Sequence, residues 1–193
     1  MGYLMSRNVI RALVVTLLLG LSRQVSAQEL SLATNLVDWA NLGTINLDAG
    51  ISVSRHVTLH AGGRLNPWEF HQSEPYMVIR EQQRTVYLGA RWWGWYVDAG
   101  WWVSGKVQYS AFDYTGLWRP AREKGQAAGL GVAAGYTLML TKHLNLEFGM
   151  GAWAGSCFDY TLYYSPAIDD VRETGSRAFV SPDSISLSIM YVF

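Results

Sequence analysis

The sequence predicts an all-β fold, an eight-stranded antiparallel up-and-down transmembrane β-barrel. Three observations indicate it. Apolar residues recur at every second position in eight stretches, which is the periodicity of strands and not of helices. Short connections alternate with long ones along the chain, as in barrels that cross a membrane. Nine Trp, eleven Tyr and 19 Gly stand among 193 residues, and so many aromatic residues in a small domain indicate an apolar surrounding.

Residues 1–27 are predicted to be a secretory signal peptide, which leaves residues 28–193 as the outer-membrane β-barrel domain. Arg7 and Arg11 come before an apolar run, and Val25-Ser26-Ala27 supplies small residues at the cleavage positions. A membrane anchor is the alternative. The apolar run from residue 12 to residue 21 is too short to cross about 30 Å of hydrocarbon, so the signal peptide is favoured.

The eight strands follow in chain order from the alternating stretches. They cover residues 30–36, 45–53, 57–65, 86–92, 97–106, 129–136, 144–151 and 184–193. The connections 54–56, 94–95 and 141–143 are short, and the connections 37–43, 66–84, 108–125 and 155–183 are long. An even number of strands places both termini on the side of the short turns. In an outer-membrane barrel that side is periplasmic, and the long loops are extracellular.

The last predicted strand ends the chain on an aromatic residue. Its large side chains alternate with Ser184, Ser186 and Ser188 and are Ile185, Leu187, Ile189, Tyr191 and Phe193. We expect this strand to close the barrel against residues 30–36 and to turn these side chains toward lipid. Deletion of Phe193 is expected to impair insertion more than it alters the fold.

Alternation alone does not tell a membrane barrel from a soluble one such as a lipocalin. In both, one face of the sheet is polar and the other apolar, and the two differ in which face lies inside. The polar face of this chain carries many glycines beside large charged and aromatic residues. Glycine weakens a solvent-facing strand, whereas an eight-stranded interior needs small residues beside large ones. This favours a polar interior and an apolar exterior.

The same assignment brings three acidic and three basic side chains into the interior. We expect a lumen ion-pair network formed by Asp48, Asp98, Glu147, Arg64, Arg91 and Lys106. Removal of Arg91 or Asp98 alone is expected to lower the unfolding temperature. In a soluble barrel these six would be surface charges.

Aromatic residues cluster at the second short turn. Trp92, Trp93, Trp95 and Tyr96 are predicted to form a periplasmic aromatic girdle, together with Tyr191 and Phe193 of the closing strand. An aromatic core cluster in a soluble protein is the alternative.

Three segments carry a resemblance to known families. The predicted signal peptide, the strand pattern and Phe193 resemble the small OmpX-type barrels of Gram-negative outer membranes. The segments LATNLVDW, RLNPWEF and ISLSIMYVF resemble a family of outer-membrane barrels of unknown function that are often encoded beside fimbrial genes. A terminal aromatic strand resembles the signal that the barrel-assembly machinery recognises. Members of that family commonly have a second cysteine near the position of Cys157, which this chain lacks.

Residues capable of chemistry are few in this sequence. His56 and His60 lie four apart on a strand, about 13 Å at 3.3 Å per residue, so no metal site is predicted. His71, Ser73 and Glu74 supply the residue types of a lipid A deacylase, but they fall in a predicted loop. We expect no catalytic residue, cofactor or metal.

The expected function is therefore non-enzymatic. The formal net charge is zero, which gives no indication of nucleic-acid binding. The sequence favours an integral protein of the cell outer membrane that presents surface loops for interaction or for assembly of cell-surface or fimbrial structures. Its expected partners are outer-membrane lipid, the barrel-assembly machinery and a surface or fimbrial protein. An outer-membrane lipid-modifying enzyme is the alternative, and lipid A mass spectra of a deletion strain and its parent would separate the two.

Overall fold

The computed structural model describes residues 30–71, 78–115, 121–163 and 171–193. The predicted signal peptide lies outside the described residues. Among those that are described, no helix is both long and apolar enough to span a membrane.

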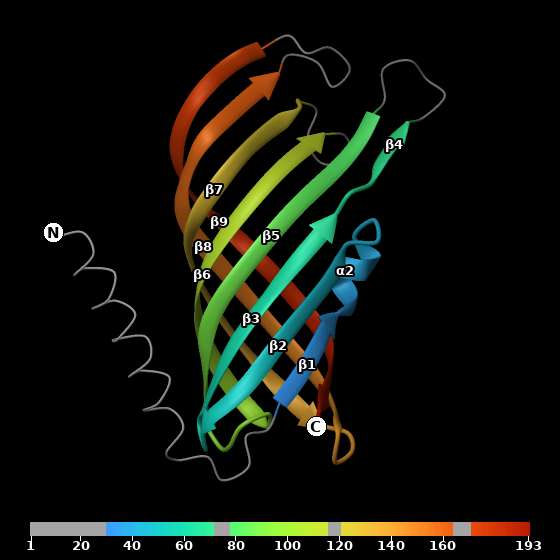
Figure 1. Ribbon diagram of the computed structural model, residues 1–193, viewed down its shortest axis with the longest axis vertical. Coiled ribbons are helices and arrows are strands. Elements are labelled where there is room, and N and C mark those ends of the chain that lie inside the picture. The colour runs from blue at the N-terminus through green and yellow to red at the C-terminus, as the bar shows by residue number, and fades with distance from the viewer. Residues whose placement is uncertain (1–29, 72–77, 116–120, 164–170) are drawn as a thin grey trace, which may run out of the picture.

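The described chain forms a single antiparallel sheet that closes on itself (Figure 1). Its strands are β1 (Leu30–Asn35), β2 (Ile45–Ser54), β3 (Val57–Asn66), β4 (Glu69–His71), β5 (Val78–Trp93), β6 (Gly100–Thr115), β7 (Glu123–Met139), β8 (Leu144–Tyr163) and β9 (Val171–Val192). β3 pairs with both β2 and β5, and β1 pairs with β9, so eight strands make a ring. The short β4 pairs with β5 beside the end of β3.

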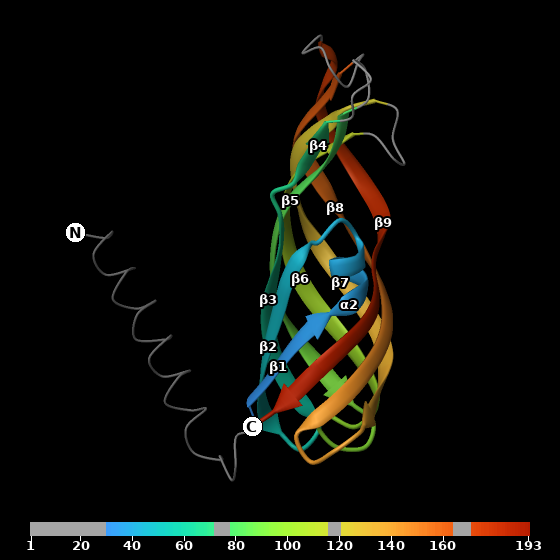
Figure 2. The same ribbon diagram turned by 90° about the vertical axis from the view of Figure 1, so that its right-hand side faces the viewer.

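The strand lengths make the ring taller on one side, as Figures 1 and 2 show. β1, β2 and β3 have 6, 10 and 10 residues, whereas β5 to β9 have 16 to 22. We call the end where β5 to β9 extend the upper end and the end that carries Phe193 the lower end. The long loops predicted at 66–84, 108–125 and 155–183 are thus wrong for much of their length, because strands continue through them.

The connections at the lower end differ in length from the prediction at one place. The turns between β2 and β3 and between β7 and β8 are short, as predicted. The turn after β5 runs from Gly94 to Ala99, so the strand predicted from residue 97 begins at Gly100. Asp98 and Gly100 have φ of 61° and 76°, and a Cβ on Gly100 would lie 2.6 Å from the Trp95 ring. Glycine is therefore required there.

The first connection is helical, which the sequence analysis did not predict. α2 (Leu36–Ala40) begins after Asn35, whose side chain accepts a hydrogen bond from the main-chain nitrogen of Val37. Asparagine is a preferred helix N-cap. Leu36, assigned to the first predicted strand, therefore belongs to the helix.

The two faces of the sheet differ in polarity in the lower part of the ring. On β7, Leu130 and Val132 are 67% and 65% exposed on the outer face, whereas Thr137 is buried inside. On β9, Ile189 and Tyr191 are exposed, as is Phe193 directly after the strand, and Met190 and Val192 pack inside against Ala33. The apolar face is outside and the polar face inside, as the glycine pattern predicts.

Candidate functional site

The first feature of the interior is an ion pair between opposite sides of the ring. Arg91 extends from β5, and its Nη1 lies 2.6 Å from Oε2 of Glu147 on β8. Thr137 donates a hydrogen bond to the same oxygen at 3.3 Å. The guanidinium group of Arg91 lies 4.2 Å from the ring centroid of Trp102. Both charged side chains are buried, so each needs the opposite charge of the other to offset the cost of its removal from water.

A second pair lies beside the first. Nδ1 of His60 on β3 is 3.0 Å from Oδ2 of Asp48 on β2. The His60 ring also contacts Tyr87, with 5.9 Å between the ring centroids. His60 was not in the predicted network, because the sequence analysis considered it only as a metal ligand.

The third feature depends on a bulge in β9. Gly151 of β8 pairs with Ser184, and the next residue, Ala152, pairs with Pro182, so Asp183 has no partner in the ladder. A bulge of this kind turns an extra side chain inward. Asp183 accepts hydrogen bonds from Nζ of Lys106 and from Nε2 of Gln108.

Asp183 also neutralises a second cation. Nη1 of Arg64 lies 3.6 Å from its Oδ1, and Nε of Arg64 lies 3.1 Å from Asp38 of α2. We call Arg64, Lys106, Asp38 and Asp183 the Asp183 group. The short helix and the bulge thus supply the two carboxylates that this group needs.

The six predicted network residues therefore divide. Arg91 and Glu147 pair with each other, Asp48 pairs with His60, and Arg64 and Lys106 pair with carboxylates that were not predicted. Asp98 lies buried in the lower turn, where Asn145 donates to its main-chain oxygen at 2.9 Å. Sequence reasoning missed Asp183 because it placed residues 155–183 in a loop. Pro182 was the available signal, since proline inside a strand marks an edge or a bulge.

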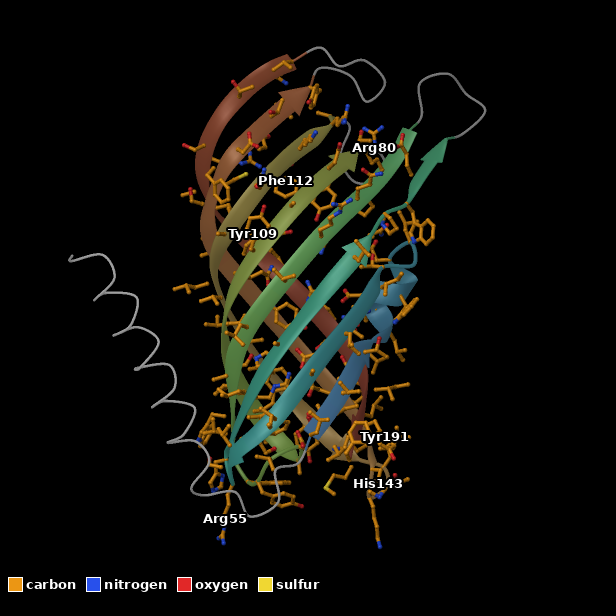
Figure 3. All side chains as sticks on the ribbon, in the orientation of Figure 1. Arg55, Arg80, Tyr109, Phe112, His143 and Tyr191 are labelled. Atoms are coloured by element: carbon orange, nitrogen blue, oxygen red, sulfur yellow. The ribbon has the colours of Figure 1, made fainter. Side chains whose placement is uncertain are left out.

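The predicted girdle residues all lie at the lower end, but one of them faces inward. Trp92, Trp95, Tyr96, Tyr191 and Phe193 are exposed; Figure 3 shows Tyr191 beside His143 there. The assignment of Trp93 to the girdle is wrong. Its side chain has no exposed surface, and its indole nitrogen donates to Thr58 at 3.0 Å. Successive side chains of a strand point to opposite faces, so Trp92 and Trp93 cannot share the outside.

Above the Asp183 group the interior opens into a larger space, which we call the upper cavity. Its volume is about 400 Å³, and it is lined by the inner faces of β5 to β9 together with Arg64 of β3. Six of the residues that line it are Gln83, Gln108, Phe112, Trp153, Cys157 and Phe179. By contrast, the space within the charged groups below is only about 70 Å³, so the charged layer forms a floor.

Two aromatic pairs stand on the sides of the upper cavity. Phe112 and Tyr114 of β6 stack with centroids 5.1 Å apart. Trp153 of β8 and Phe179 of β9 meet edge to face at 4.5 Å. Phe112 and Tyr114 fall within the connection predicted at 108–125, yet they lie on the inner face of a strand. Tyr109 points outward and donates to Gln126 (Figure 3).

Ion pairs connect the rim of the upper end. Arg122 donates two hydrogen bonds to Asp113, at 2.9 and 2.7 Å, and Arg80 donates to Glu69 at 2.7 Å. Figure 3 shows Arg80 at this height. These contacts link β4, β5 and β6 to the segment that enters β7.

Of the residues considered for chemistry, His60 pairs with Asp48 as described above, and His71, predicted in a loop, is the last residue of β4. Ser73 and Glu74 lie outside the described residues. Within the described ranges, no three or more His, Cys, Asp or Glu side chains are placed to hold a metal ion. Cys157 is a free, buried thiol in the wall of the upper cavity.

A family model described as "Protein of unknown function (DUF3575)" matches residues 13–193 of the chain. No curated protein matches it.

Proposed function

We propose that this chain, which belongs to the DUF3575 family of proteins of unknown function, is an integral β-barrel protein of the Gram-negative outer membrane. In this proposal its role is non-enzymatic, and it presents its upper end at the cell surface.

The observation that carries the proposal is the apolar outer face of the ring. The exposed apolar side chains include Val86, Leu88, Trp92, Val103, Val107, Leu130, Val132, Phe148, Met150 and Ile185. They lie side by side across β5 to β9, because Leu88, Val107 and Leu130 are direct partners in the ladder. A soluble protein rarely exposes so large a contiguous apolar surface, whereas lipid requires one.

The height of this apolar belt supports a membrane span. On β8, the outward positions from Leu144 to Ala154 are all apolar, which matches the ~9–11 residues of a tilted membrane strand. The belt ends upward at exposed charged residues, Arg84 on β5 and Lys124 on β7. At the lower end it stops at the exposed aromatic residues, which is where an interfacial girdle belongs.

The interior argues against a pore. Eight strands leave an interior that side chains can fill, and here Arg91, Glu147 and the Asp183 group occupy it. What remains is the upper end, where β5 to β9 continue above the belt. The proposed role is interaction at this end with a surface protein. A fimbrial component is the proposed partner, because the sequence resembles barrels encoded beside fimbrial genes.

Membrane fractionation tests the proposal. The full-length chain, expressed in a Gram-negative host with its own leader, is expected in the outer-membrane fraction and to resist extraction with sodium carbonate. Recovery in the soluble periplasmic fraction without detergent would contradict the proposal. An abundant periplasmic protein serves as the control for leakage.

A further inference from the structure

The upper cavity contains a buried polar atom with no partner among the described residues. Gln108 lies on β6 at the bottom of the cavity and is only 6% exposed. Its Nε2 donates to Asp183 at 3.1 Å, while its Oε1 is buried without a hydrogen bond. Leaving a buried acceptor unpaired has a cost. A ligand that donates a hydrogen bond would offset this cost once the Gln108 carboxamide turns its oxygen, which has almost no accessible surface, toward the cavity.

The register of the sheet makes room beside that oxygen. Gln108 pairs with Gly129, Gly129 with Gly155, and Gly155 with Phe179, so the row across β6 to β9 has no side chain in its middle. A Cβ on Gly129 would lie 2.2 Å from the main-chain oxygen of Ala154. Any side chain at this position would therefore clash with the backbone of β8. The result is a trough between the Gln108 carboxamide and the Phe179 ring.

The row above continues the trough. Ser110 pairs with Ala127, Ala127 with Cys157, and Cys157 with Arg177, so two small residues again stand in the middle. The larger aromatic residues stand at the sides, with Phe112 on β6 and Phe179 on β9. The volume of about 400 Å³ falls within the roughly 300–1,000 Å³ of small-molecule sites.

The charges around the trough already have partners. Asp183 is neutralised by Lys106 and Arg64, and Nη2 of Arg177 lies 3.8 Å from Glu123. The hydroxyl groups of Thr85 and Ser110 bond each other at 2.8 Å. Among the residues that the structure describes, the site thus offers no unbalanced charge to an ionic ligand. It offers an acceptor and aromatic surfaces.

We propose that the upper cavity binds a neutral sugar residue. A pyranose ring has hydroxyl groups that can donate to Gln108 Oε1, and it has a face of C–H groups that packs against aromatic rings such as Phe112. This inference goes beyond the proposed function. It rests on the proposed function only in placing the cavity at the cell surface.

Calorimetric titration of the purified protein tests the inference. The detergent must lack a sugar head group, because a maltoside would itself compete. The probes are glucose, galactose, mannose, N-acetylglucosamine and their β1–4-linked disaccharides. At least one is expected to bind with a Kd at or below about 1 mM.

Two variants and a matched control locate the site. Gln108→Leu is expected to weaken binding of that sugar about tenfold, because the acceptor is lost, and Phe112→Leu is expected to weaken it as well. Gln126→Leu is the control, since Gln126 lies on the outer face and bonds Tyr109 and Asp159. Each variant must first show an unfolding temperature close to that of the parent protein, so that a loss of binding is not a loss of the fold.

The inference is overturned if no sugar binds at about 10 mM, or if binding is unchanged in folded Gln108→Leu and Phe112→Leu proteins. Neither result touches the membrane location, which the fractionation measures separately. Binding of a charged or planar aromatic probe in place of every sugar would also overturn the sugar assignment.

Discussion

Arg91 shows how one residue can connect two sides of the ring. Its guanidinium group joins Glu147 on β8 and stacks on Trp102 of β6. A buried ion pair does not necessarily add stability relative to apolar residues, but losing one partner leaves an uncompensated charge.

A double-mutant cycle on this pair gives the first prediction at the scale of residues. Arg91→Met and Glu147→Gln are each expected to lower the free energy of unfolding by about 3 kcal/mol. The double variant is expected to lose clearly less free energy of unfolding than the two single variants added together, because neither charge is then buried without its partner. Urea unfolding in detergent micelles measures this, and additive losses would show that the pair is not coupled.

Asp183 carries the second prediction. Asp183→Asn leaves Lys106 and Arg64 with less compensation, so a loss of about 2–3 kcal/mol is expected. Asp159→Asn is the control, since Asp159 accepts from Gln126 on the exposed outer face and should change stability by less than about 0.5 kcal/mol. Equal effects of the two substitutions would contradict the role of the bulge.

At the scale of elements, β9 combines two functions. Its lower part closes the ring by pairing with β1 from Ser188 to Val192. Its upper part continues beyond β1 and pairs with β8 up to Val171. That part carries Arg172, Glu173, Arg177 and Pro182, and charged residues and proline are common means of protecting a strand edge from unwanted pairing.

The end of β9 gives the prediction for this scale. In the folded ring, Phe193 contributes one main-chain hydrogen bond to Leu30 at 3.0 Å and an edge contact with the Tyr191 ring. Deleting Phe193 is therefore expected to lower the unfolding temperature of refolded protein by only a few degrees. The amount of protein inserted in cells is expected to fall severalfold, because the deletion removes the residue proposed to act as an assembly signal.

Quantitative blotting of outer-membrane fractions, beside thermal unfolding of the refolded protein, separates these two effects. Phe148→Ala is the control, since Phe148 is exposed on the outer face of β8 and is not terminal. Equal insertion of the deletion variant and the parent would contradict the role of Phe193 as a signal.

The strands that the sequence predicted are those with one face in the apolar belt. There, residues such as Leu130 and Val132 alternate with Gly131 and Ala133, and the period of two is visible. Above the belt both faces carry polar residues. The alternation is then lost, although the ladder continues through Gln126 and Asp159, so loops were predicted where strands exist.

The candidate site was predicted less completely, for a related reason. Arg91 and Glu147 lie on strands with clear alternation, so their inward orientation followed directly. Asp183 and Cys157 lie next to register shifts in the ladder, and a bulge changes which side chains point inward. The pairing that sets such a shift depends on the neighbouring strand, which a single stretch of sequence does not contain.

At the scale of the whole molecule, the ring reverses the usual arrangement of a soluble domain. Charged residues fill its middle, and Leu, Val, Met and Trp cover its outside. The described part of the chain has only small clusters of buried apolar residues, such as Ala33, Met190 and Val192. In the proposed membrane location lipid would cover this belt, and the strands are joined by main-chain hydrogen bonds around the full ring.

Gel mobility with and without heating is the most direct test of a closed membrane ring. The protein, purified in detergent, is loaded in sodium dodecyl sulfate either unheated or after boiling, with the Arg91→Met variant beside it. The unheated protein is expected to migrate as a separate, compact band that boiling converts to the unfolded position, and the variant is expected to convert at a lower temperature. A single band whose mobility does not change on heating would contradict a closed ring embedded in the membrane.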